Sequence, residues 1–191
     1  MRKTYVRNLT AGCAAFMAAA LIFSAGFSKT AFADEADKTT LVYGSTDYTR
    51  INPAMDEHCE INVLLFDGLT DHDGDNQIIP RLAKSWEYDE ENLTYTFHLE
   101  EGVKWHDGEP FTAEDVKFTF EAIMDPANES ENAPDYEDIE SIEVIDEHTV
   151  AFHLSNVNTA FLEYMTKPVM PKHLLEGEDW QTSGFFRAPV G

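Results

Sequence analysis

A strict alternation of apolar and polar residues occupies the stretch Leu93-Thr94-Tyr95-Thr96-Phe97-His98-Leu99. Successive side chains of a β-strand point to opposite faces, so this period of two predicts a strand with one buried and one polar face. Further along the chain, Thr112 and Asp115 have the spacing of a capping box. They predict the start of a helix, which Asp125-Pro126 ends because the residue before a proline disfavours helical geometry.

The rest of the chain adds shorter elements on both sides of this strand and helix. They are a strand at 39–43, a helix that begins at Asp56 and ends at Gly68, strands at 139–145 and 149–154, and a short helix at 160–165. Strands and helices in this order predict an α/β or α+β fold.

The composition is that of a globular protein with an acidic surface. The 191 residues include 13 Lys and Arg against 36 Asp and Glu, a formal net charge of −23, and 43% are hydrophobic. Nucleic-acid binding is excluded because phosphate groups require a basic patch, and docking on an anionic membrane surface is disfavoured for the same reason. The length allows one domain or part of a larger one.

The first 33 residues have the three parts of an export signal. A basic start precedes an apolar stretch at 14–23, and Ala31-Phe32-Ala33 matches a cleavage site between small residues. We expect 1–33 to be a signal peptide and the mature protein to be exported, to the periplasm or the outer face of the cytoplasmic membrane; an uncleaved anchor is the alternative. Cys13 precedes the apolar stretch and is therefore not a lipidation site. Cys59 then remains as the only cysteine, which excludes an intrachain disulfide.

No run of residues has the spacing of a catalytic or metal site. The run Asp71-His72-Asp73-Gly74-Asp75-Asn76 resembles the start of a calcium loop, but Asn76 and Leu82 occupy the positions that require Gly and Glu, so we interpret it as a solvated turn. His58-Cys59-Glu60 cannot converge on one ion because adjacent helical residues point in different directions. His106-Asp107 is interpreted as a surface turn. We predict no catalytic residue, no metal site and no cofactor. The number of carboxylates, 36, does not by itself exclude a glycosidase, which needs a pair of them.

Several blocks of the chain carry a resemblance to a known family. In chain order they are Asn52-Pro53, Leu65-Phe66-Asp67-Gly68-Leu69, Ile79-Pro80-Arg81-Leu82-Ala83-Lys84-Ser85-Trp86-Glu87, Leu93-Thr94-Tyr95-Thr96-Phe97-His98-Leu99, Gly102-Val103-Lys104-Trp105-His106-Asp107-Gly108 and Phe111-Thr112-Ala113-Glu114-Asp115-Val116-Lys117-Phe118. Their order and spacing resemble the family 5 extracellular solute-binding proteins, the receptors of peptide and nickel ABC importers. The resemblance covers nearly all of residues 39–191.

This resemblance implies a two-lobed clamp of the type II periplasmic-binding-protein kind with a small accessory α+β domain. Residues 39–68 would start lobe I, 69–168 would form the accessory domain, and 169–191 would return into lobe I. Pro189-Val190-Gly191 matches the beginning of a family motif that continues with Thr-Gly-Pro, so the chain is expected to be truncated. The large aromatic residues of the matching blocks are expected to be core, namely Trp86, Tyr95, Phe97, Trp105 and Phe120.

The resemblance also implies a function without catalysis. The protein would capture short peptides outside the cytoplasmic membrane and deliver them to an ABC permease. Nickel or a nickel chelate is the alternative ligand within the family, and an exported hydrolase is the alternative from a different class.

In a clamp the ligand meets loops at strand ends and helix starts, which places the candidate ligand-binding residues after the first predicted strand and at the start of the next helix. Arg50 would pair with a ligand carboxylate, Tyr48 would offer an aromatic wall and a hydroxyl, and Cys59 would matter for nickel. The full set of candidates is Tyr48, Thr49, Arg50, Asn52, His58 and Cys59.

Overall fold

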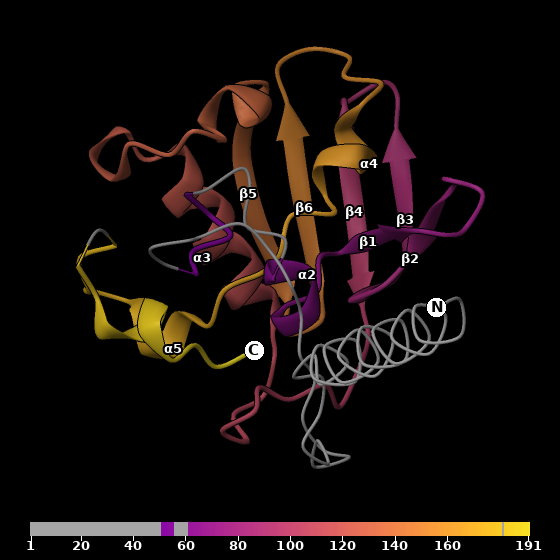
Figure 1. Ribbon diagram of the computed structural model, residues 1–191. Helices are drawn as coiled ribbons and strands as arrows, with labels where there is room; N and C mark the ends of the chain where they lie inside the picture. Colours follow the sequence, from indigo (N-terminus) through magenta and orange to yellow (C-terminus); the bar gives the residue numbers. More distant parts are fainter. Residues whose placement is uncertain (1–50, 56–60, 181) are drawn as a thin grey trace, which may run out of the picture. The chain divides into compact units, whose positions relative to one another are not determined.

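The computed structural model describes residues 51–55, 61–180 and 182–191, which all belong to one compact unit (Figure 1). The predicted signal peptide at 1–33 and the predicted strand at 39–43 lie outside the described residues. Within the described ranges, no helix is long and apolar enough to cross a membrane.

A four-stranded antiparallel sheet forms the centre of this unit. Its strands are β3 (Ala83–Asp89), β4 (Thr94–Leu99), β6 (Thr149–Leu154) and β5 (Ile139–Asp146), in the spatial order β3-β4-β6-β5 (Figure 1). The three predicted strands that lie within the described residues are confirmed, within one residue at their ends. The edge strand β3 was not predicted, because apolar and polar residues alternate only in its second half, at 86–89.

One face of the sheet is buried by aromatic packing. The alternate residues Tyr95, Phe97 and Leu99 of β4 are buried, as the period of two predicts. Helix α3 (Ala113–Met124) places Phe120 edge-on against Phe152 of β6, with ring centroids 5.3 Å apart. The short helix α4 (Phe161–Tyr164) stacks Phe161 on Tyr95 at 4.7 Å. The core therefore lies between one face of the sheet and these two helices.

The predicted core residues are confirmed with one exception. Tyr95, Phe97, Trp105 and Phe120 are buried, but Trp86 is only half-buried. Trp86 lies on the edge strand β3 and packs against Phe97 from the rim of the core, with ring centroids 6.3 Å apart. An edge strand has a neighbour on one side only, which leaves part of a large side chain in water.

Helix α3 begins and ends where the sequence predicts. The capping box between Thr112 and Asp115 is present, and Asp125 is the C-cap residue before Pro126. The acidic segment that follows forms two single turns of 3₁₀-helix, η1 (Pro126–Asn128) and η2 (Ala133–Tyr136), before the chain enters β5.

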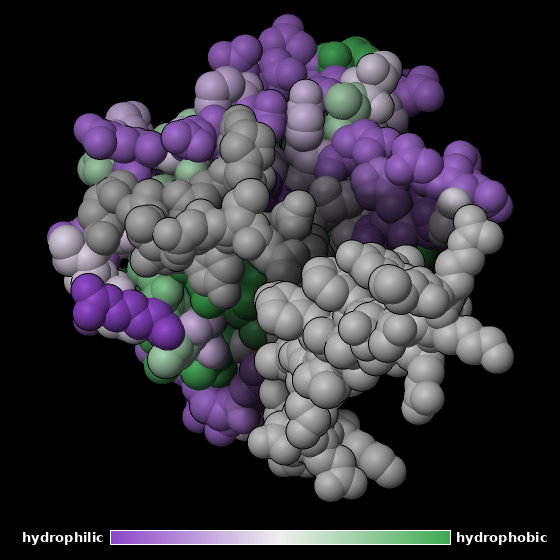
Figure 2. Space-filling view, in the orientation of Figure 1, coloured by the Kyte–Doolittle hydropathy of each residue, from purple (hydrophilic) through white to green (hydrophobic). Residues whose placement is uncertain are grey.

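A small hairpin precedes the main sheet. Strands β1 (Thr70–His72) and β2 (Ile78–Pro80) pair antiparallel around the aspartate-rich turn. The side chain of Asp73 accepts hydrogen bonds from the backbone N–H groups of Asp75 and Gln77, both at 2.9 Å, so its carboxylate closes the turn itself. The predicted solvated turn is confirmed, and it contributes to a hydrophilic surface at the right of Figure 2.

Gly68 does not end the preceding helix, contrary to the prediction. The described helix α2 (Asn62–Leu65) has Phe66 as its C-cap, two residues before this glycine. A Cβ atom on Gly68 would lie 2.5 Å from the carbonyl oxygen of Thr166. The glycine is thus required by the close approach of two backbone segments and not by helix termination.

The last part of the chain packs back onto the unit through helix α5 (Lys172–Leu175) and the 3₁₀ turn η3 (Gly184–Arg187). Leu175, Trp180 and Phe186 are the buried side chains of this part. Trp180 packs between Phe118 of α3 and Phe186, with ring centroids 5.5 Å and 6.0 Å away.

Candidate functional site

Of the predicted ligand-binding residues, the structure describes Asn52 alone. The others, Tyr48, Thr49, Arg50, His58 and Cys59, lie outside the described residues. The structure therefore describes the surroundings of Asn52 and not the predicted site as a whole.

Asn52 begins a buried turn at 51–55. Its carbonyl oxygen accepts the N–H of Met55 at 3.2 Å, and Pro53 fixes the backbone between them. The side chain is 0% exposed, and its amide nitrogen donates to the carbonyl of Trp180 at 3.3 Å. Its Oδ1 atom has no hydrogen-bond partner within the described ranges. The amide nitrogen is thus used to hold the turn, and the oxygen is the group left to act as an acceptor.

A second hydrogen bond joins the 51–55 turn to the last part of the chain. The N–H of Ile51 donates to the carbonyl of Phe186 at 3.1 Å. Residues 51 and 52 are therefore bound to the region around Trp180 and Phe186, more than a hundred positions along the chain. This arrangement fixes residues 51 and 52 to the last part of the chain.

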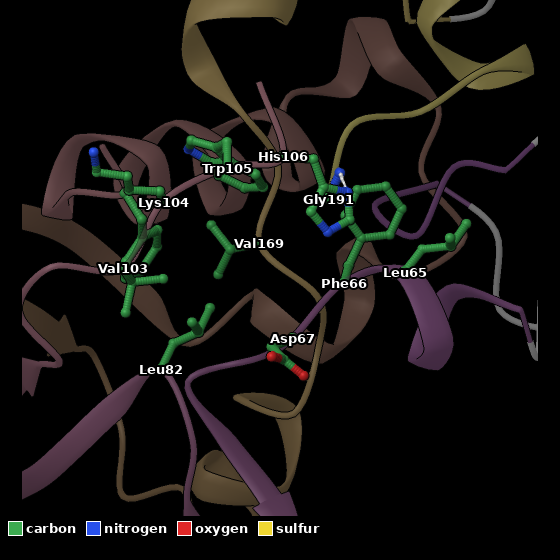
Figure 3. A pocket seen from close by; sticks show the side chains of 11 residues that line it. Leu65, Phe66, Asp67, Leu82, Val103, Lys104, Trp105, His106, Val169 and Gly191 are labelled. Atoms are coloured by element: carbon green, nitrogen blue, oxygen red, sulfur yellow. Dashed lines mark hydrogen bonds between the residues drawn. The ribbon is translucent and has the colours of Figure 1, made fainter. Parts of the chain in front are cut away.

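A separate pocket of about 140 Å³ lies beside α2 and the loop that follows β4 (Figure 3). Its lining is mostly apolar, with a few polar groups, and consists of Leu65, Phe66, Asp67, Leu82, Val103, Lys104, Trp105, His106, Phe111, Val169 and Gly191. Ligand pockets are typically about 300–1,000 Å³. This one has room for a small apolar group but not for a peptide.

One wall of the pocket is closed by His106 and Gly191. The N–H of His106 donates to the carbonyl of Gly191 at 2.8 Å, and Nδ1 of the imidazole accepts the N–H of Gly191 at 3.2 Å (Figure 3). Gly191 also lies so close to the carbonyl of Leu65 that a Cβ atom would collide with it. The predicted surface turn at His106-Asp107 is confirmed, and His106 in addition binds Gly191 through both its backbone and its side chain.

Two carboxylates at or beside this pocket are paired with basic side chains. Nε of Arg81 donates to Oδ1 of Asp67 at 2.9 Å, and this bond raises the pKa of Arg81. Asp107 accepts a hydrogen bond from Nε2 of His173 at 2.8 Å, which holds the pKa of Asp107 below its ordinary value. The lowered pKa of Asp107 is the opposite of what a general acid at neutral pH requires.

A wider, open depression of about 830 Å³ lies over the polar face of the main sheet. His153 of β6 lies in its lining, where Nδ1 contacts the hydroxyl of Thr94 at 3.0 Å and Nε2 contacts Glu143 at 3.4 Å. These bonds link three neighbouring strands across the face. The face is polar as the alternation in β4 predicts.

Among the residues that the structure describes, no three His, Cys, Asp or Glu side chains come together to hold a metal ion. The carboxylates of the aspartate-rich turn at 71–76 also form no such group. The two residues that the sequence analysis connects with nickel, His58 and Cys59, lie outside the described part of the chain.

Sequence reasoning missed the pocket and the pairing of His106 with Gly191. The block from Gly102 to Gly108 was interpreted only as containing a surface turn and as part of the family resemblance. A Trp-His-Asp-Gly run predicts a turn, but nothing in it indicates that a glycine 85 positions away completes the wall.

The sequence of the chain matches a known protein family. The sequence model described as "Bacterial extracellular solute-binding proteins, family 5 Middle" matches residues 77–191, more than half of the chain. Di/tripeptide-binding protein 1 of Pseudomonas aeruginosa is 37% identical over 122 residues, which cover 54% of this chain and 23% of the relative. The chain thus spans about a quarter of the length of that relative.

Solved structures give the same fold. NikZ from Campylobacter jejuni, in complex with Ni(L-His), has a TM-score of 0.74 and 41% identity, covering 76% of this chain and 30% of NikZ. The oligopeptide-binding protein AppA from Bacillus subtilis, in complex with a nonapeptide, has a TM-score of 0.70 and 27% identity, covering 76% of this chain and 31% of AppA. The predicted mixed α/β fold of the periplasmic-binding-protein type is confirmed. The chain therefore belongs to the family 5 bacterial extracellular solute-binding proteins.

Proposed function

We propose that this chain is part of the substrate-binding component of an ABC importer, which captures short peptides and delivers them to a membrane permease. The main support is the relative named a di/tripeptide-binding protein, which aligns with 54% of the chain. The protein would act after export, with residues 1–33 removed as a signal peptide, in the periplasm or on the outer face of the cytoplasmic membrane.

The proposed division of the chain has lobe I starting at 39–68, an accessory domain at 69–168 and a return into lobe I at 169–191. The hydrogen bonds of Ile51 to Phe186 and of Asn52 to Trp180 support it, because they join the first and last of these segments. The main sheet with α3 and α4 would then be the accessory domain, which contains most of the buried aromatic residues.

The ligand would bind beside the 51–55 turn. In this proposal Arg50 pairs with the carboxylate of a peptide, Tyr48 and Thr49 contact its backbone, and Asn52 Oδ1 accepts one of its N–H groups. His58 and Cys59 line the cleft. No enzymatic step is part of the proposal, and binding followed by release to the permease is sufficient.

The test is calorimetry on the complete exported protein with a mixture of di- and tripeptides. Arg50→Ala should weaken binding by about tenfold, the loss of one charge-assisted contact of about 1.5 kcal/mol. Cys59→Ser is the control and should leave the affinity within about twofold, because a thiol that lines the cleft makes no essential bond. The absence of a measurable heat of binding with every peptide in the mixture would contradict the proposal.

A nickel chelate is the second candidate. The reason to keep it is NikZ, which is 41% identical and was solved with Ni(L-His). Imidazole and thiolate are good ligands for nickel, so His58 and Cys59 would then be essential. Titration with Ni(L-His) distinguishes the two proposals, since tight binding that Cys59→Ser abolishes would favour nickel and contradict the peptide proposal.

A further inference from the structure

Two side chains from the acidic segment after α3 bond the carbonyl oxygen of Ala54. Oγ of Ser130 donates to it at 2.7 Å, and the amide nitrogen of Asn132 donates to it at 3.1 Å. The backbone of the same segment adds a weaker contact, from the N–H of Glu131 to the carbonyl of Met55 at 3.4 Å. We call Ser130 and Asn132 the clasp of the 51–55 turn.

Within the clasp, Asn132 is buried, Ser130 is half-buried, and the two are hydrogen-bonded to each other. Asn132 is 2% exposed, and its Oδ1 accepts a hydrogen bond from the ammonium group of Lys167 at 2.7 Å. The hydroxyl of Ser130 also accepts the N–H of Asn132 at 3.2 Å. Both polar ends of the Asn132 amide are therefore bonded in an environment with little water, where such bonds are strongest and their loss is most costly.

The segment that carries the clasp is itself fixed to the core. Tyr136 is 1% exposed, its hydroxyl donates to the carbonyl of Tyr164 at 2.8 Å, and its ring lies 5.2 Å from that of Phe120. Just before the clasp, Glu129 has a left-handed backbone with φ of 51°. Such a conformation is strained for a residue other than glycine and persists only when the surroundings impose it.

We infer that Asn132, together with Ser130, is a positioning residue of the ligand site: by holding the carbonyl of Ala54 it sets the direction of the 51–55 turn. This inference rests on the proposed function, because the candidate ligand-binding residue Asn52 belongs to that turn. The acidic segment after α3 thus acts on a site about 80 positions earlier in the sequence. The contact is indirect, since Asn132 bonds the turn and not the ligand.

The test compares four variants of the complete exported protein with the wild type. Asn132→Ala and Ser130→Ala each remove one donor to Ala54. Asn132→Asp keeps the volume and an oxygen for Lys167 but has no N–H to donate, so it separates the clasp from the Lys167 contact. Tyr136→Phe is the matched control, because it removes a buried hydrogen bond of the same segment that does not reach the turn.

Two quantities are measured at a temperature where circular dichroism shows each variant to be folded. One is the affinity for an equimolar mixture of dipeptides and tripeptides, and the other is amide hydrogen exchange of the unliganded protein over residues 51–55. Asn132→Ala and Asn132→Asp should weaken binding by about fivefold, the equivalent of one net hydrogen bond, and should speed exchange in the turn. Tyr136→Phe should lower the melting temperature and change neither quantity.

The possible outcomes distinguish failure of the positioning role from failure of the proposed function. Wild-type affinity in Asn132→Ala, or equal weakening by Tyr136→Phe, would overturn the positioning role in a protein that does bind peptides. Recovery of full affinity in Asn132→Asp would overturn it too, because the donor would then be unnecessary. A wild-type protein that binds no peptide would overturn the proposed function and this inference with it, whatever the exchange rates show.

Discussion

The carboxylate of Asp115 accepts a hydrogen bond from the backbone N–H of Lys172 at 2.9 Å, 57 positions further along the chain. Its other oxygen accepts the N–H of Thr112 at 2.9 Å, which is the capping bond at the start of α3. A single buried side chain therefore caps one helix and fixes the first residue of another. Asp115 is 4% exposed, so both bonds are shielded from water.

Asp115→Ala should lower the free energy of unfolding by about 2–4 kcal/mol, because it removes a helix cap and a second buried charge-assisted bond together. Urea unfolding measures this. Glu114→Ala is the control, since Glu114 makes only an exposed ion pair with Lys172 and should cost less than about 1 kcal/mol. Equal losses for the two variants would contradict the double role of Asp115.

Gly68→Ala should destabilise the protein by about 2 kcal/mol or more, because its Cβ would meet the carbonyl group of Thr166 at 2.5 Å and backbone must move to make room. Gly74→Ala is the matched control. A Cβ at Gly74 meets nothing within 4 Å, so this change should stay within about 0.5 kcal/mol. The difference in melting temperature between the two variants is the measurement.

Phe152→Ala should cost about 3–5 kcal/mol, the range for an aromatic residue lost from a packed core. Phe152 is 0% exposed and contacts the rings of Phe97, Phe120 and Phe161 from three different elements. Val157→Ala serves as the control, because Val157 is 68% exposed. A loss below about 1 kcal/mol for Phe152→Ala would show that the aromatic cluster is not the core of the unit.

The pair of Asp107 and His173 should make stability depend on pH in acid. The hydrogen bond from His173 lowers the pKa of Asp107 in the folded protein. The folded state then binds this proton less readily than the unfolded chain does. The stabilisation is present above the unfolded pKa of about 3.9 and is lost as the pH falls through the lower folded pKa.

Asp107→Asn should therefore lose less stability than the wild type between about pH 5 and pH 2, because the titrating carboxylate is gone. His173→Leu, which removes the donor, should flatten the same part of the curve. Melting temperatures across this pH range are the measurement. A slope in Asp107→Asn as steep as that of the wild type would show that the pair contributes nothing to acid unfolding.

The sequence alone was sufficient wherever a structural rule is local. The alternation at Leu93–Leu99 predicted β4 and its buried face, since side-chain direction in a strand depends only on position. The capping box at Thr112 and Asp115 predicted the start of α3 because both bonds lie within one turn of helix. The order of such local blocks was also enough to indicate the family.

Local rules failed where a residue acts through a distant partner. Gly68 looked like a helix terminator, and only the approach of Thr166 revealed why a glycine stands there. His106 is a turn residue as predicted, but its bonds to Gly191 were not predicted, and no role was predicted for Asn132. Their partners, Gly191 and Ala54, lie 85 and 78 positions away, and nothing in either local sequence indicates them.

The sequence by itself determined the fold class, the main strand and helix, the aspartate-rich turn, and the membership of a solute-binding family, because each depends on short-range periodicity, capping, turn residues or the order of blocks. Tertiary structure decided the burial of Asn52, the pocket between His106 and Gly191, and the clasp on Ala54. The physical reason is that these features consist of hydrogen bonds and close contacts between segments that meet only after the core has formed. Their geometry is set by the packing of β4, β6 and α3, and not by the residues next to them in the chain.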